Sequence, residues 1–289
     1  MAERIALGRH TTMLGGPDLG KYPSGNPLLV EGPDARVLID SAVGVEIPDT
    51  DLVLLSHFHE DHTVGIGARP DLPAQIHQRD AAGVRTVDGF AAASGFPGEE
   101  YARELAEVFH HRGVEQVQPF ADDAGWDLGG GVRITAVPLP GHTSGHTGFL
   151  IEPDGVFFTA DVDLSSFGPF YGDVEASLTD TRESLARCSQ VEAAHYATFH
   201  HKRVIDGRDE FLRLLAAYAD VLTRREQAVL DLLTEPRTLD ELVGQGVVYR
   251  PGKVPAYAAE SERRMVARHL DELVLRGAVA HEDERYSLR

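Results

Sequence analysis

The segment Asp51–Ile66, DLVLLSHFHEDHTVGI, decides how this 289-residue chain is interpreted. Its apolar first half is typical of a buried β-strand and runs directly into His57, His59, Asp61 and His62. Alternate residues of an extended segment share one face, so His57 and His59 can reach the same metal ion. Asp61 and His62 fall in the following turn, where they can reach a second ion. The segment therefore predicts the first half of a metal centre.

Further ligands are expected at the ends of other strands, because a metal centre needs donors from distant segments. His142 follows VRITAVPLPG, Asp161 follows VFFTA, and His201 follows YATFH. Imidazole and carboxylate are ligands that Zn²⁺ accepts. The single cysteine, Cys188, excludes a thiolate-rich structural zinc site, and its helical setting predicts a buried structural thiol. The predicted metal centre is therefore catalytic rather than structural.

The first 208 residues alternate short strands with helices, which predicts an α/β architecture with sheets between helices. Strands are expected at 28–30, 37–39, 52–55, 132–137, 149–151, 156–159 and 196–199, and helices at 98–111 and 179–188. The segments LLVEGPDARVLIDS and FLIEPDGVFFTADV both contain a strand, an acidic turn, a strand and an aspartate. Related halves would place Asp40 and Asp161 at strand ends beside a ligand crevice. Two unrelated hairpins with aspartate turns would look the same.

Charge and composition exclude several classes of protein. The chain has 46 acidic and 27 basic residues and a formal net charge of −19, so we expect no nucleic-acid partner. The N-terminal segment is charged early and lacks the apolar core of a signal peptide. Residues 134–151 are uncharged but contain two prolines and three glycines, which excludes a membrane-spanning helix there. A cytoplasmic enzyme with no membrane contact is the expectation.

From Asp209 the pattern becomes helical. Thr238 is expected to cap a helix, another helix is expected over 263–275, and a hairpin is expected after Gly277. We therefore predict a catalytic domain over 1–208 and a winged-helix-like domain over 209–289. Such modules often bind DNA, but this one has 12 basic and 15 acidic residues, which favours packing or homodimerisation.

These motifs together resemble the metallo-β-lactamase superfamily over about residues 20–208. The superfamily signature is found here as Asp40 in VLIDSAVG, HFHEDH at 57–62, His142 in PGHTSGHTGF, Asp161 in FFTADVD and His201 in HHKRVI. The resemblance implies a four-layered αβ/βα sandwich built from two similar halves. It implies a first metal at His57, His59 and His142, and a second at Asp61, His62 and His201. It further implies that Asp161 bridges the metals and that a buried Asp40 orients the histidines.

The sequence leaves the roles of three positions near the expected ligands undecided. The last motif of the superfamily usually reads Gly-His-Gly, whereas His200 and His201 are adjacent here. Either could be the ligand, and the register of the following strand favours His201. Asp163 follows the bridging aspartate and is expected to cap a turn rather than to bind metal. His146 could support a ligand, contact substrate or make a structural hydrogen bond.

The predicted activity is hydrolysis at a pair of divalent ions, expected to be Zn²⁺, with Fe or Mn as alternatives. A hydroxide between the metals would attack an acyl carbon, and Asp61 would orient it. Phe167, Phe170 and Tyr171 are expected to form an apolar wall of the substrate pocket, although ordinary packing would explain them equally well. Such a pocket suits small thioesters, esters or lactones. The glyoxalase-II-like and thioesterase-like branches with a helical C-terminal module are the nearest analogues at the level of fold.

Two other activities and one non-catalytic role are alternatives. A phosphodiesterase or ribonuclease of the same fold is the first, and the acidic charge opposes it. A mononuclear-iron sulfur dioxygenase is the second, because related ligand sets hold a single iron. A non-catalytic binding module is the third, and the presence of every expected ligand opposes it.

Overall fold

The computed structural model describes residues 3–96, 103, 105–252 and 256–289, and two β-sheets form the centre of this part of the chain. Within the described residues, the first sheet has seven strands in chain order: β1 (Glu3–Ala6), β2 (Thr11–Gly15), β3 (Leu28–Glu31), β4 (Arg36–Ile39), β5 (Leu52–Leu55), β6 (Ala74–His77) and β7 (Gln118–Phe120). The second sheet, counted over the same residues, has six strands in the spatial order β13 (Val204–Asp206), β12 (His195–Ala197), β11 (Val156–Phe158), β10 (Thr147–Glu152), β9 (Arg133–Pro138) and β8 (Gly125–Asp127).

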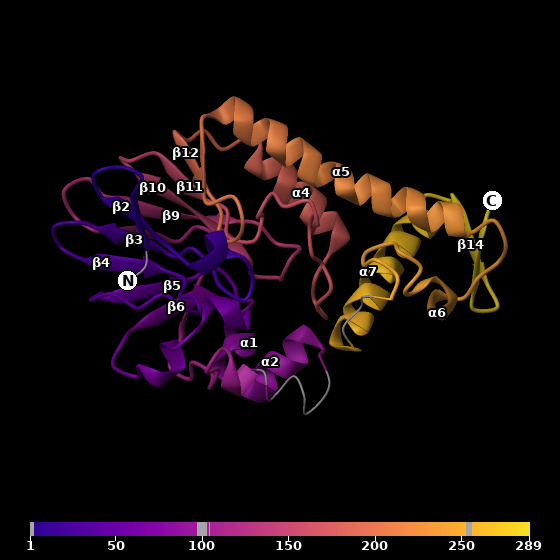
Figure 1. Cartoon of the computed structure of the whole chain (residues 1–289), viewed down its shortest axis with the longest axis horizontal. Helices are drawn as coiled ribbons and strands as arrows, with labels where there is room; N and C mark the ends of the chain where they lie inside the picture. Colours follow the sequence, from indigo (N-terminus) through magenta and orange to yellow (C-terminus); the bar gives the residue numbers. More distant parts are fainter. Residues whose placement is uncertain (1–2, 97–102, 104, 253–255) are drawn as a thin grey trace.

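Helices cover the outer face of each sheet, so the molecule has four layers (Figure 1). Helices α1 (Ala81–Arg85) and α2 (Val87–Ser94) pack on the first sheet, and α4 (Leu178–Cys188) and α5 (Arg208–Leu232) pack on the second. The strand period of two produces this arrangement. In β4, Val37 and Ile39 point into the core between the sheets, while Leu38 joins the core beneath α1 and α2. The predicted αβ/βα sandwich is confirmed.

The two halves repeat the same pairing pattern. Strand β3 pairs antiparallel with β4, and β4 pairs parallel with β5. In the second sheet, β10 pairs antiparallel with β11, and β11 pairs parallel with β12. Asp40 and Asp161 follow β4 and β11 at equivalent ends of the two sheets, as the similarity of the two sequence segments predicted. This repeat brings chemistry-bearing residues from both halves to one edge of the sandwich.

All seven predicted strands form, within two residues of the expected bounds. The helix expected at 98–111 falls partly on residues 98–102 and 104, which lie outside the described part of the chain, and residues 105–107 are helical. The expected helix at 179–188 is α4. Short 3₁₀ helices occur at η1 (Pro17–Gly20), η2 (Glu60–His62) and η3 (Ile66–Ala68).

The C-terminal part contains α6 (Leu239–Leu242), α7 (Ala256–Leu275) and the hairpin β14 (Val279–Glu282) and β15 (Arg285–Leu288). The predicted cap is confirmed: Thr238 and Glu241 form a reciprocal capping box at the start of α6. Helix α5 is continuous and contributes to two cores, with Phe211 beside the second sheet and Val229 among the C-terminal elements (Figure 1). The division at residue 208 stays a prediction.

Cys188 is fully buried in the core beneath α4, as expected for a structural thiol. Burial raises the pKa of this thiol to about 12, so it is protonated at neutral pH. Among the helices of the described residues, none combines the length and the apolar character needed to cross a bilayer.

Candidate metal centre

Four segments deliver the candidate ligands to one edge of the sandwich. The loop after β5 carries His57 and His59 and continues into η2, and the loop between β9 and β10 carries His142. Asp161 follows β11, and His200 follows β12. Strand ends of α/β sheets form crevices of this kind, because the backbone turns away and leaves side chains converging.

Three histidines and Asp161 form a first cluster. His57 Nε2 lies 2.9 Å from His59 Nδ1, and His142 Nε2 lies 3.2 and 3.0 Å from these two atoms. Asp161 Oδ2 is 3.3 Å from His142 Nε2 and 3.9 Å from His57 Nε2. Ligands about 2.0–2.1 Å from a tetrahedral zinc ion lie roughly 3.3 Å from one another, so the spacing fits such an ion.

Outer hydrogen bonds determine which nitrogen of His59 and His142 faces the cluster. His59 Nε2 donates to Asp173 Oδ2 at 2.7 Å, and His142 Nδ1 donates to the Phe170 carbonyl at 3.0 Å. These oxygens only accept, so in the neutral imidazole the other ring nitrogen carries a lone pair. His59 Nδ1 and His142 Nε2 therefore present lone pairs to a shared point, which is the arrangement that a cation requires.

The same logic applies to His57 and His62 through Ser56 and Asp40. The Ser56 hydroxyl donates to Asp40 Oδ2 at 2.8 Å and so accepts from His57 Nδ1 at 3.0 Å. Asp40 Oδ2 also accepts from His62 Nδ1 at 2.9 Å. Asp40 is fully buried and orients one histidine directly and one through Ser56.

Asp61, His62 and His200 form a second cluster beside the first. His200 Nε2 lies 3.0 Å from Asp61 Oδ2, and its Nδ1 donates to the Gly20 carbonyl at 2.8 Å. His62 Nε2 and Asp161 Oδ1 lie 3.0 Å apart, yet each is buried without a hydrogen-bond partner among the described residues. Buried polar atoms without partners are costly, and a cation between them would satisfy both.

The sequence favoured His201 as the third member of this cluster, but the structure places His200 there. His200 faces Asp61, whereas His201 Nε2 faces Asp163 at 3.6 Å and its side chain is about one-third exposed. His201 adopts a left-handed φ of 61°, which turns the chain after β12 and directs its side chain away from Asp61. The usual glycine of the superfamily motif at this position suits such a turn.

Asp161 lies between the clusters, with Oδ2 toward the first and Oδ1 toward the second. His146 positions its backbone: His146 Nδ1 donates to the Leu139 carbonyl, and His146 Nε2 accepts from the Asp161 amide at 3.2 Å. Burial lowers the pKa of His146 to about 3, so it is neutral and keeps this acceptor. Tyr218 holds the next peptide group by donating to the Asp161 carbonyl at 3.1 Å.

Burial also keeps a central ligand neutral. It holds the pKa of His57 well below its ordinary value, and the neighbouring His62 and His59 lower it further. A neutral imidazole is the form that binds a metal ion.

A cleft of about 330 Å³ opens over both clusters. Phe167 and Phe170 line it, as expected of two of the three predicted aromatic residues. Tyr171 does not line the cleft, which corrects its predicted role in binding substrate. Its ring is fully buried, and its hydroxyl is 2.8 Å from His269 Nε2 of α7. The helix that buries Tyr171 is distant in sequence, so the loop pattern alone could not reveal this contact.

Further residues complete the cleft wall. Tyr22 lies at the cleft and donates to Glu60 Oε1 at 3.1 Å. Burial and the nearby Asp61 raise the pKa of Glu60 to about 7. The remaining contributors are Phe96, and, from beyond residue 208, Tyr249, Ala258 and Ser261.

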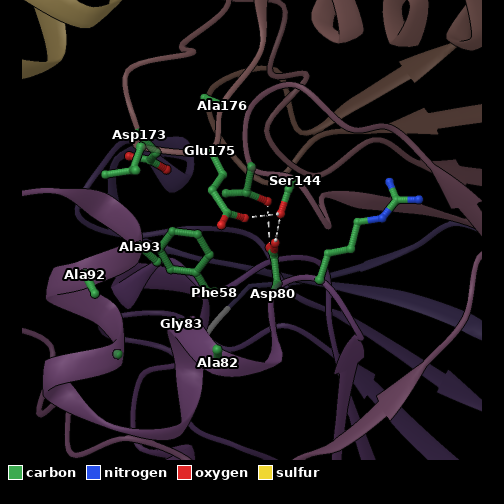
Figure 2. Close-up of a pocket in the computed structure, with 14 residues that line it drawn as sticks. Phe58, Asp80, Ala82, Gly83, Ala92, Ala93, Ser144, Asp173, Glu175 and Ala176 are labelled. Atoms are coloured by element: carbon green, nitrogen blue, oxygen red, sulfur yellow. Dashed lines mark hydrogen bonds between the residues drawn. The ribbon is translucent and has the colours of Figure 1, made fainter.

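A second cavity, of about 210 Å³, is bordered by Asp173, the hydrogen-bond partner of His59 (Figure 2). Asp173 lines it, as does Asp80, which is near Ser144 and Glu175 in the figure. Asp80 accepts from Thr143 Oγ1 and the Gly145 amide, both at 2.6 Å, and so holds the turn that follows His142. Asp80 and Asp173 are thus supports of the first cluster that no sequence motif marks.

The sequence is similar to two N-acyl homoserine lactonases. No protein-family model matches the sequence. The N-acyl homoserine lactonase AttM of Azorhizobium caulinodans is 33% identical over 139 residues, which are 48% of this chain and 45% of that protein. The lactonase AttM of Agrobacterium fabrum is 27% identical over 175 residues, 58% of this chain and 61% of that protein. The chain thus spans about half to three fifths of the length of these curated relatives.

The similarity of structure extends further along the chain. The crystal structure of a metallo-β-lactamase family protein from Thermus thermophilus superimposes with a TM-score of 0.75. The two chains are 25% identical, and the match covers 98% of this chain and 100% of the other. The match therefore includes the C-terminal elements as well as the sandwich.

Proposed function

We propose that this chain, which belongs to the metallo-β-lactamase superfamily, is a metal-dependent hydrolase that opens small lactones or cleaves related esters and thioesters. The observation that carries the proposal is the convergence of histidine lone pairs on one point, 2.9–3.2 Å from one another, with Asp161 extending to a second cluster. Both curated relatives are named as lactonases, which supports an acyl substrate.

We propose two ions per chain, with zinc as the metal. His57, His59 and His142 would hold one, Asp61, His62 and His200 the other, and Asp161 would contact both. Nitrogen and carboxylate donors in a buried, partly open site suit zinc. Divalent ions there would lower the pKa of water from 15.7 to about 7 and polarise an acyl oxygen.

The residues of the chain itself would bind and orient the substrate. Phe96, Phe167 and Phe170 offer an apolar surface for an acyl group and exclude water from the reacting carbon. The Asp61 carboxylate lines the cleft, so it would accept a hydrogen bond from the attacking water and orient it toward the acyl carbon. Asp161 is held at its amide and carbonyl, which fixes the backbone from which its carboxylate reaches the two clusters.

The cleft itself favours a neutral acyl substrate over a phosphodiester. Its wall includes Glu60, Asp61, Asp161 and Asp163, and the described residues that line it include no arginine or lysine. A phosphodiester brings negative charge and needs cationic side chains around it. Cleavage of RNA or another phosphodiester is therefore not favoured by this site.

A hydrolysis screen tests the proposal. Protein loaded with zinc, and separately with iron, would be assayed with lactone, thioester, aryl ester and bis-phosphodiester probes and with a persulfide. We expect turnover of acyl probes by the zinc form and loss of it in His59→Ala. His195→Ala is the matched control, because this histidine begins β12, away from the strand end that carries His200. Persulfide oxidation by the iron form, or phosphodiester cleavage alone, would replace the proposal with one of the alternatives.

A further inference from the structure

The loop formed by residues 165–176 supplies the outer partners of two first-cluster histidines. Asp173 accepts from His59, and the Phe170 carbonyl accepts from His142. The loop contains no helix or strand. Few backbone hydrogen bonds join its own residues, the shortest being from the Gly168 amide to the Ser165 carbonyl at 3.2 Å. Something outside the loop must therefore keep Asp173 and Phe170 in register with their histidines.

Arginines from helices beyond residue 208 grip this loop by its carbonyl oxygens. Arg268 of α7 donates from Nη1 to the Tyr171 carbonyl and from Nη2 to the Asp173 carbonyl, both at 2.7 Å. Arg225 of α5 donates to the Pro169 carbonyl at 2.5 Å and the Phe167 carbonyl at 2.7 Å. A third residue, Arg264 of α7, donates to the carbonyls of Gly172, Ser94 and Gly95.

These contacts are directed at the backbone rather than at a charge. Within the described part of the chain, none of the three arginines has a carboxylate within ion-pair distance in the structure. Arg225 is buried, and its guanidinium lies 5.0 Å from the centre of the Phe167 ring. A planar guanidinium donates its hydrogen bonds in fixed directions. It therefore fixes the positions of the two carbonyl oxygens that accept from it. The arrangement suits positioning better than general adhesion.

The loop that the arginines hold supports the first metal cluster and not the second. His62 and His200 of the second cluster take their outer partners from Asp40 and Gly20, which lie outside the 165–176 loop. His59 and His142 depend on the loop, and both belong to the first cluster. Any function of the arginines should therefore appear at the first metal alone.

We propose that Arg225, Arg264 and Arg268 are positioning residues of the metal centre. By holding the loop carbonyls, they present Asp173 and the Phe170 carbonyl to His59 and His142, and so set the affinity of the first site. The inference rests on the proposed metal centre and extends it: the C-terminal helices complete a site whose ligands all come from the sandwich. Partners of this kind typically change metal affinity 10–100-fold when removed.

Zinc affinity of the full chain, measured against a competing chromophoric chelator, tests this. Arg268→Met and Arg225→Met keep the apolar stem and remove the donors. Each would be made in a His200→Ala background to report the first site, and in a His59→Ala background to report the second. We expect the first-site Kd to rise at least about tenfold, which is the lower end of the 10–100-fold range for lost outer partners. The second-site Kd should change less than twofold.

The control is Arg263→Met on the same helix, whose guanidinium pairs with Asp240 of α6 at 2.9 Å and does not contact the loop. It should leave both Kd values unchanged. In the His200→Ala background, Asp173→Asn should weaken zinc binding, and combining it with Arg268→Met should add little, since both act through one hydrogen bond. Arg268→Lys, which keeps one charged donor, serves if the methionine variant does not fold, and should give an intermediate Kd.

Three results would overturn the inference. Equal first-site Kd values in the parent and the arginine variants would show that the grip does not set affinity. Equal weakening of both sites would indicate general loss of structure. A wild-type chain that binds no zinc would remove the proposed metal centre itself, and that failure is distinguishable because it precedes any comparison of variants.

Discussion

Replacing His200 with alanine should remove the second metal ion from the chain, whereas replacing His201 should leave both ions bound. The two residues are adjacent and chemically identical, so the pair isolates geometry from composition. His200 Nε2 is 3.0 Å from Asp61 Oδ2 and 3.7 Å from Asp161 Oδ1. His201 Nε2 instead faces Asp163. The two substitutions remove the same number of atoms and differ only in which imidazole is lost.

The size of the effect follows from the number of ligands. Apparent binding free energies of structural zinc sites with four ligands are about 10–16 kcal/mol, or roughly 3 kcal/mol per ligand. The second cluster offers Asp61, His62, His200 and an oxygen of Asp161. Because about 1.4 kcal/mol corresponds to a factor of ten, losing His200 should weaken the second site roughly 100-fold.

Elemental analysis at buffered free zinc measures this directly. At free zinc about ten times the wild-type second-site Kd, mass action fills roughly nine tenths of that site in the wild type and about one tenth after a 100-fold loss. We expect about two zinc ions per chain in the wild type and His201→Ala, and about one in His200→Ala. The reverse pattern, with His201→Ala losing the ion, would refute the assignment and restore the expectation from the register of the following strand.

Three further predictions concern stability and reactivity. Burial lowers the pKa of His269 to about 3, below its unfolded value near 6.5, so the unfolded chain binds more protons between these values. As pH falls from 6.5 toward 3, this group should lower the free energy of unfolding by up to about 1.4 kcal/mol per pH unit. In urea unfolding of the metal-free proteins, the free energy of unfolding of His269→Gln should therefore fall less steeply with pH than that of the wild type, by the same amount. Cys188 should resist maleimide in the folded chain and react once urea unfolds it, and rapid labelling of the native protein would contradict its burial. Phe149→Ala should lower the free energy of unfolding by about 3–5 kcal/mol in urea titrations, whereas Val87→Ala, at a site 38% exposed, should change it by less than about 0.5 kcal/mol.

The central strands were predictable because burial on two faces leaves a strong local signal. Leu52–Leu55 is apolar throughout and lies between two parallel neighbours. Its polar continuation at His57 and His59 contrasts with that strand, which made the ligands visible. Edge strands lack this contrast. The β1 strand, Glu3–Ala6, is mostly exposed, so its sequence resembles an ordinary surface segment.

The choice between His200 and His201 depends on one backbone angle, which residue patterns do not encode reliably. Adjacent side chains of an extended segment point to opposite faces, so a turn displaced by one residue exchanges their roles. The turn here occurs at residue 201, with φ of 61°, and the Thr198 hydroxyl donates to the His200 carbonyl at 2.6 Å. The pairing of β12 with β13 places the two strands on either side of that turn, with Ala197 opposite Val204.

The partners of Asp173 and Tyr171 could not be predicted from the sequence for a different reason. Asp173 meets His59 across 114 residues, and Tyr171 meets His269 across 98. Neither contact belongs to a motif, because each depends on how two separately folded segments dock. An aspartate is usually exposed, so the residue type gave no sign that Asp173 is buried. For Tyr171 the sequence left ordinary packing open but could not identify its partner.

Because three arginines bind the 165–176 loop, the surface charge of residues 209–289 differs from the charge that their composition gives. Residues 209–289 contain 12 basic and 15 acidic residues. Three of the basic residues, Arg225, Arg264 and Arg268, donate to loop carbonyls and face inward. The outward charge of this part is therefore more acidic than its composition indicates, and polyphosphate would be repelled. We expect no shift of a single-stranded RNA probe in gels at about 0.15 M salt, and a salt-dependent shift that disappears on truncation after Leu232 would contradict this reading of the helices.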